Sequence, residues 1–119
     1  YFRTLYCACN AVMCFADGDY RHCASEILQC EQLTKALIVP YDTGILYLTK
    51  ALLCCYSAQL DIAETPLADV LTEDIAYYCA HCRKCMAGGK AGAFEQELLK
   101  RLECGCSDPL PGFLQVTKN

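Results

Sequence analysis

Apolar residues recur every three or four positions along most of this chain, which is the spacing that places side chains on one face of an α-helix. Between residues 20 and 37 these positions are Cys23, Ile27, Cys30, Leu33 and Leu37. No segment shows the strict alternation of apolar and polar residues that is typical of a half-buried β-strand. The pattern therefore predicts an all-α fold.

Turn-forming residues interrupt this pattern and divide the chain into about six predicted helices. These helices cover about residues 2–16, 20–37, 45–58, 62–71, 75–86 and 91–102. Gly18 marks the first break, residues 39–44 form a linker that contains Pro40, and Gly88 ends the fifth helix. Pro66 either kinks the fourth helix or marks its first turn.

Short breaks make successive helices neighbours in space, and such neighbours pack antiparallel. We therefore expect stacked helix–turn–helix hairpins over about residues 2–37, 45–71 and 74–104. Together they form a single domain over residues 1–106, and residues 107–119 form a C-terminal coil tail. A chain of 119 residues, of which 55% are hydrophobic, matches one domain with its own core.

The breaks at Gly18, Gln59 and Gly88 lie about 30 to 40 residues apart, which is the period expected for helical-hairpin repeats. The first break opens the stretch Gly-Asp-Tyr-Arg-His-Cys-Ala-Ser-Glu-Ile-Leu-Gln-Cys, residues 18–30. This stretch resembles the turn and second helix of a tetratricopeptide repeat.

Small residues carry part of this resemblance. Cys23 and Cys30 stand where the tetratricopeptide family prefers Ala, and Ala11 stands where its first helix prefers Gly. Residues 47–64, followed by Leu67, resemble a second copy. This second copy is also similar to repeats in the large tetratricopeptide subunits of the anaphase-promoting complex.

Residues 88–99 resemble a degenerate third copy. The repeat-final Pro and the aromatic residue that opens the first helix are both absent, and the spacing between copies is irregular. The resemblance implies an α–α superhelix of stacked hairpins. Its concave face and exposed end would bind partner helices or extended peptides.

Charge and motif content narrow the function further. The net charge of −4 argues against nucleic-acid and anionic-membrane partners, because both require a basic patch. No apolar stretch is long enough to span a membrane, so we expect a soluble protein. No phosphate-binding loop, His-Glu-x-x-His or nucleophile motif occurs, so we expect neither an enzyme nor a cofactor.

The sequence therefore predicts a protein-interaction or scaffold module, whose partner is another protein or peptide. The open ends of a repeat stack also favour a homo-oligomer. Tyrosine suits protein contacts because it combines a large apolar area with a polar tip. The candidate contact residues are Tyr41, Tyr47, Tyr56, Tyr77 and Tyr78, more than half of which we expect to be core or linker packing. The histidines His22 and His81 lack a partner at hydrogen-bonding spacing.

The twelve cysteines allow two interpretations. Such a density is typical of a secreted disulfide scaffold, whereas their helical spacing and the low content of Gly and Pro favour buried thiols. Buried thiols would place the protein inside the cell, and we favour this interpretation slightly. The alternative function is a secreted helical protein, a ligand or ligand carrier, held by disulfides.

Four cysteines are arranged symmetrically about the first turn. Cys7, Cys14, Cys23 and Cys30 are separated by seven, nine and seven residues. In an antiparallel hairpin Cys14 falls opposite Cys23, and Cys7 falls opposite Cys30. This geometry fits two disulfides, and it equally fits small apolar residues between closely packed helices. The pair at positions 54 and 55 shows no matching partner symmetry.

Five further cysteines have spacings that recur in zinc and iron–sulfur sites. They are Cys79, Cys82, Cys85, Cys104 and Cys106. On a helix, each step of three residues rotates the side chain by about 60°, so the first three thiols sweep about 120° of helix surface and do not converge. The second alternative function is therefore a thiol-rich bundle that binds Cu(I) or Zn.

Overall fold

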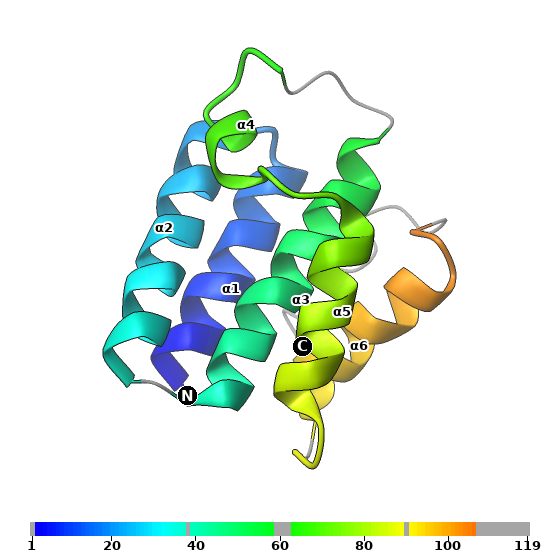
Figure 1. Ribbon diagram of the computed structural model, residues 1–119. Helices are drawn as coiled ribbons and strands as arrows, with labels where there is room; N and C mark the ends of the chain where they lie inside the picture. Colours follow the sequence, from blue (N-terminus) through cyan, green and yellow to red (C-terminus); the bar gives the residue numbers. More distant parts are fainter. Residues whose placement is uncertain (1, 38, 59–62, 90, 107–119) are drawn as a thin grey trace.

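The computed structural model describes residues 2–37, 39–58, 63–89 and 91–106 of the chain (Figure 1). Six helices occur in these ranges, and no strand does, so the all-α prediction is confirmed. The helices are α1 (Phe2–Ala16), α2 (Tyr20–Leu37), α3 (Pro40–Ser57), α4 (Leu67–Val70), α5 (Ile75–Met86) and α6 (Ala93–Glu103). The predicted coil over residues 107–119 lies outside the described residues.

The turn between α1 and α2 follows from a few local contacts. Gly18 adopts a φ of 78°, which glycine reaches without the Cβ clash that other residues suffer. The N–H of Asp19 donates to the carbonyl of Cys14 at 2.9 Å, and so closes the end of α1. The Asp19 carboxylate accepts the N–H of His22 and begins α2. The two helices then pack side by side (Figure 1).

Helix α3 lies at the centre of the structure and packs against α1, α2, α5 and α6 (Figure 1). It begins at Pro40, so the predicted linker over residues 39–44 is wrong. Val39 is extended, as a residue before proline must be, and Pro40 occupies the first turn. Proline is well tolerated there because the N–H groups of the first turn have no partner within the helix.

Helices α1 and α2 pack against each other, whereas the helices after them pair differently from the second and third predicted hairpins. Helix α4 is a single turn of four residues that follows Pro66 directly, and it packs against α2. Helix α5 takes the expected place of α4 against α3, so residues 45–71 do not form a packed hairpin. Helix α6 also packs on α3. Residues 74–104 are therefore two helices that share α3 as their main support.

The core is built from aliphatic side chains and cysteines. Leu48, Leu52 and Leu53 of α3 are fully buried among Ile27 of α2 and Leu98 of α6. The buried cysteines are Cys7, Cys23, Cys30, Cys82 and Cys106. Small thiols at these positions allow the helices to approach closely, in the way that alanine does.

None of the helices in the described part of the chain combines the length and the apolar character that a membrane span requires.

Gly44 sets the distance between α3 and α5. A Cβ atom built on Gly44 would overlap the Met86 side chain and would lie 3.3 Å from the Cβ of Cys85 and from the backbone nitrogen of Met86. The backbones of the two helices therefore meet at this point, and any side chain would force them apart.

We predict that Gly44→Ala lowers the free energy of unfolding by about 1–3 kcal/mol, because overpacking at this contact outweighs the helix propensity that alanine adds. Urea unfolding followed by circular dichroism measures the change. Ser25→Ala, on the exposed face of α2, is the control and should change stability by less than about 0.5 kcal/mol. A Gly44→Ala variant as stable as the parent would show that α3 and α5 do not approach this closely.

Candidate functional site

Four aromatic rings gather where α5 crosses α3. The Tyr77 and His81 ring centroids lie 4.1 Å apart, and Tyr47 lies 5.2 Å from His81. The Tyr78 ring stacks on Tyr47 at 6.1 Å with an interplanar angle of 29°. We call Tyr47, Tyr77, Tyr78 and His81 the aromatic cluster.

Local structure explains how these rings come together. The Asp74 carboxylate accepts the N–H of Tyr77 at 2.8 Å and caps the start of α5, which fixes the rotation of that helix. Tyr77 and His81 are four residues apart and therefore lie on the same face of α5. The Nδ1 of His81 also lies 3.0 Å from the carbonyl oxygen of Tyr77.

The rings of the aromatic cluster differ in exposure. Tyr77 is 39% exposed and Tyr78 is only 1% exposed. The hydroxyl of Tyr78 accepts the backbone N–H of Glu73 at 3.0 Å, so its polar tip is satisfied inside the protein. Tyr47 and His81 are half-buried. Tyr77, Tyr47 and His81 are accordingly available to a partner, and Tyr78 is a core residue.

A cavity of about 350 Å³ lies beside the aromatic cluster, between α2 and α3. It is lined by Glu31, Thr34, Lys35, Thr43, Leu46, Tyr47 and Lys50. Tyr47 belongs to both features and joins them into one surface. Burial and the neighbouring Tyr77 raise the pKa of the Tyr47 hydroxyl, so this group stays protonated and can donate a hydrogen bond.

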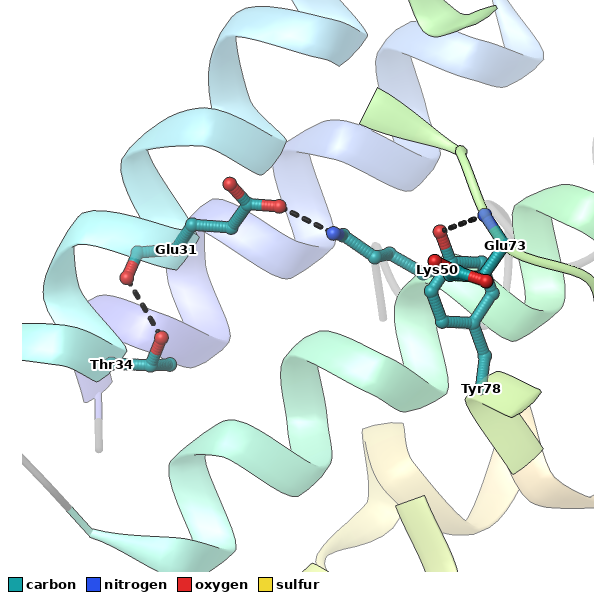
Figure 2. A network of polar contacts seen from close by, with 5 residues as sticks. All are labelled: Glu31, Thr34, Lys50, Glu73 and Tyr78. Carbon is teal, nitrogen blue, oxygen red and sulfur yellow. Dashed lines mark hydrogen bonds and ion pairs between the residues drawn. The ribbon is translucent and has the colours of Figure 1, made fainter. Parts of the chain in front are cut away.

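Lys50 lines this cavity and points from α3 toward Glu31 of α2 (Figure 2). The residue is only 8% exposed, and its side chain forms an ion pair with Glu31. Its ammonium nitrogen also lies 5.5 Å from the centroid of the Tyr78 ring, within the range of a cation–π interaction. Thr34 donates to the carbonyl of Glu31 at 2.8 Å. Lys50 therefore ties α2, α3 and α5 together.

The other two predicted contact tyrosines hold α6 in place. The hydroxyl of Tyr41 donates to the buried carboxylate of Glu95 at 2.8 Å. The hydroxyl of Tyr56 accepts a hydrogen bond from the guanidinium of Arg101, also at 2.8 Å. Both bonds join α3 to α6 and are only partly buried. The structure thus brings Tyr47, Tyr77 and Tyr78 together and places Tyr41 and Tyr56 elsewhere.

Of the four symmetric cysteines, Cys7, Cys23 and Cys30 are buried and Cys14 is half-buried. Burial and the neighbouring Cys14 raise the pKa of Cys23 to about 12. Burial and the neighbouring Cys7 likewise raise the pKa of Cys30 to about 12. Cys14 thus lies near Cys23, and Cys7 lies near Cys30. The Cys30 thiol donates to the carbonyl of residue 4, so it has a polar partner as a free thiol.

The cysteines of the proposed metal site are spread over several places. Cys79 and Cys82 line a cavity of about 120 Å³ together with Leu99 and Leu102 of α6. Cys85 lies beside Gly44 of α3. Cys104 is exposed, and Cys106 is buried in the hydrophobic core. Within the described ranges, no three or more His, Cys, Asp or Glu side chains are grouped so that they could hold a metal ion.

No protein-family model, no curated protein and no solved structure matches this chain.

Sequence reasoning missed His81, Lys50 and Glu31 of this site, and outside the site it missed the partner of His22. His81 looked isolated, although its spacing of four residues from Tyr77 was the signal that could have revealed their contact. His22 looked isolated as well, yet its ring lies 2.5 Å from the Asp19 carboxylate. The pairing of Lys50 with Glu31 joins two helices and had no local signal.

A second cavity, of about 550 Å³, lies between α1 and α2 and is lined by Arg3, Tyr6, Cys7, Gln29, Gln32 and Leu33. Tyr6 is 68% exposed at its edge. Among the residues that the structure describes, the lining of this cavity forms no ring contact and no ion pair, so it provides a comparison surface.

We predict that Lys50→Met lowers the free energy of unfolding by about 1–2 kcal/mol, because the half-buried Glu31 carboxylate loses its counter-charge. The double variant Glu31→Gln/Lys50→Met should recover most of this loss, and chemical unfolding of the single and double variants measures it. Lys35 lines the same cavity but is exposed. The control variant Lys35→Met should therefore change the free energy of unfolding by less than about 0.5 kcal/mol. If the losses of stability of Lys50→Met and of Glu31→Gln simply add in the double variant, Lys50 and Glu31 do not form a coupled pair.

Proposed function

We propose that this chain is a protein-interaction module without catalysis, built from tetratricopeptide-like helical hairpins, and that it binds a peptide segment at the cavity between α2 and α3. The observation that carries the proposal is the continuity of this cavity with the exposed side of the aromatic cluster, through Tyr47. Exposed aromatic side chains beside a hollow are typical of protein-contact surfaces.

The packing around α3 supports a repeat stack. In such a stack each hairpin contacts its neighbours only, so a helix of the second hairpin touches both helices of the first. Helix α3 packs on α1 and α2, and its own partner is α5. The stack would then consist of α1 with α2, α3 with α5, and α6 as the first helix of a third hairpin. Helix α4 would belong to an insertion that packs on α2.

The charges of the cavity indicate the chemistry of the peptide. Lys50 and Glu31 are paired with each other, whereas Lys35 is exposed at the edge of the same cavity. Lys35 can therefore receive a carboxylate from a partner. Tyr47 and Tyr77 offer apolar area to an aromatic or aliphatic side chain. The expected ligand carries one apolar anchor and one acidic residue. Because the chain as a whole has a net charge of −4, the attraction of the acidic residue to Lys35 would act only at short range.

The second candidate function is a secreted helical protein held by disulfides. The proximity of Cys14 to Cys23 and of Cys7 to Cys30 favours it. The two candidates differ in thiol content. Protein from its native source that reacts with alkylating agents at all cysteines without reductant supports the first candidate, and protein without free thiols supports the second.

We predict that peptides selected from a random library against the immobilised chain contain an apolar anchor and an acidic residue. Tyr77→Ala should weaken their binding about tenfold or more, because truncating an aromatic hot-spot residue costs about 2 kcal/mol or more, and about 1.4 kcal/mol corresponds to a tenfold change in Kd. Lys35→Glu should weaken binding of the acidic peptides and leave their Ala-substituted forms unaffected. Fluorescence anisotropy of labelled peptides measures each Kd.

Tyr6→Ala is the matched control, since it removes the same side chain from the more exposed position beside the cavity between α1 and α2. The Tyr6→Ala variant should bind the selected peptides with the same Kd as the parent chain. Peptides whose binding depends on Tyr6 and is indifferent to Tyr77 and Lys35 would show that the proposed site is wrong.

A further inference from the structure

Three sulfur-containing side chains lie along one face of α5. Cys79, Cys82 and Met86 follow one another at intervals of three and four residues, which places them on the same face of a helix. The Cys82 thiol donates to the thioether sulfur of Met86 at 3.6 Å. A long side chain on a helix leans toward the preceding turn, which is how Met86 reaches Cys82. Helix α5 therefore presents two thiols and one thioether in a row.

A small cavity adjoins this row of sulfur atoms, between α5 and α6. Cys79 and Cys82 both line it, and the space measures about 120 Å³. Leu99 and Leu102 of α6 form its apolar side. Pockets that hold organic ligands measure roughly 300–1,000 Å³, whereas a water-sized ligand needs far less space than this cavity offers. The cavity therefore suits a single ion better than an organic molecule.

The ligand atoms indicate which ion fits. Thiolate and thioether sulfur atoms are soft ligands, and they favour the soft ion Cu(I). Structural Zn²⁺ sites require a complete tetrahedral set of ligands. Among the described residues, no three or more His, Cys, Asp or Glu side chains are grouped for such a set. Cu(I) is satisfied by fewer ligands, and the thioether of Met86 adds one that Zn²⁺ rarely uses.

The surroundings of the two thiols fit a bound monovalent cation. One Cu(I) ion with two thiolates carries a single negative charge. Arg83 lines the same cavity and is exposed, so its guanidinium can approach and balance this charge. Glu103 of α6 lines the cavity too, and solvent screens its repulsion because it is exposed. Cys82 is only 2% exposed, whereas Cys79 is half-buried, so an ion enters past Cys79.

We propose that α5 carries a binding site for one Cu(I) ion, which the sulfur atoms of Cys79, Cys82 and Met86 hold in the cavity beneath Leu99 and Leu102 of α6.

Binding exchanges protons for the metal ion. Cu(I) displaces the proton of the Cys79 thiol and that of the Cys82 thiol, and it forms a copper–sulfur bond with each thiolate. The Met86 thioether donates a lone pair and loses no proton. Two protons pass to the solvent, and no electron is transferred, so the ion remains Cu(I).

This site is separate from the proposed peptide site. Tyr77 precedes Cys79 by two residues, which is a rotation of about 200° around the helix, so the two side chains lie on opposite faces of α5. Tyr77→Ala should therefore bind Cu(I) as the parent chain does. The peptide site and the Cu(I) site can thus fail independently of each other.

The test titrates the full reduced chain with Cu(I) in the absence of oxygen, in competition with the chromogenic chelator bicinchoninate. Native mass spectrometry counts the bound ions, and the absorbance of the chelator complex gives the Kd of the tightest one. Cys79→Ser and Cys82→Ser should each raise this Kd about 100-fold or more, because losing a metal ligand costs at least as much as losing its outer hydrogen-bond partner. Met86→Leu should raise it about tenfold, since the neutral thioether is the weaker ligand.

Cys85 provides the matched control, because it lies on the same helix and is half-buried as Cys79 is. Cys85→Ser should leave the Kd of the tightest Cu(I) ion unchanged. Circular dichroism verifies that each variant keeps its helices. The test does not depend on the buried Cys82, because Cys79→Ser changes a half-buried position and Met86→Leu nearly conserves the side-chain volume.

Three results would overturn the proposal. If Cys79→Ser and Met86→Leu both bind Cu(I) as tightly as the parent chain, the row of sulfur atoms is ordinary packing. If Cys85→Ser loses the tightest ion, the metal is bound elsewhere. If an equal concentration of Zn²⁺ displaces Cu(I) from the parent chain, the site does not select a soft ion.

Discussion

The burial of α3 by four other helices is the constraint on which the rest of this structure depends. Helix α3 packs on α1, α2, α5 and α6, so its surface must be apolar or small in most directions (Figure 1). The run from Ile45 to Leu53 meets this demand, and every residue of it except Tyr47 is buried. Gly44 extends the same surface and lets α5 approach closely. The positions of α1, α2, α5 and α6 therefore depend on their contacts with α3.

This central position also explains why the polar groups of α3 define the candidate site. A polar side chain on a buried helix needs a partner from another helix or from its own backbone. Thr49 donates to the carbonyl of Ile45 at 2.8 Å, whereas Lys50 reaches Glu31 of α2 and the ring of Tyr78 on α5. The same residue therefore fixes three helices and shapes the cavity beside Tyr47. Stability and the proposed binding surface share one set of contacts.

The sequence predicted the local features of the fold. It did not predict which helices pack together when they lie far apart in the chain. The first turn and the pairing of α1 with α2 follow from helical spacing around Gly18. The pairing of α3 with α5 does not, because α4 lies between them in the chain, and only packing decides that α4 covers α2. The sequence pattern places Pro40 in a linker, although proline is also favoured in the first turn of a helix.

Native-state hydrogen exchange tests the central place of α3 most directly. If the other helices depend on α3, its buried amides between residues 45 and 53 should exchange only through global unfolding. Their exchange free energies should then equal the free energy of unfolding from urea denaturation. They should also be at least as large as those of the most protected amides of α1, α2, α5 and α6. Amides of α3 that exchange through local opening, at a lower free energy than those of α1 and α2, would contradict this account.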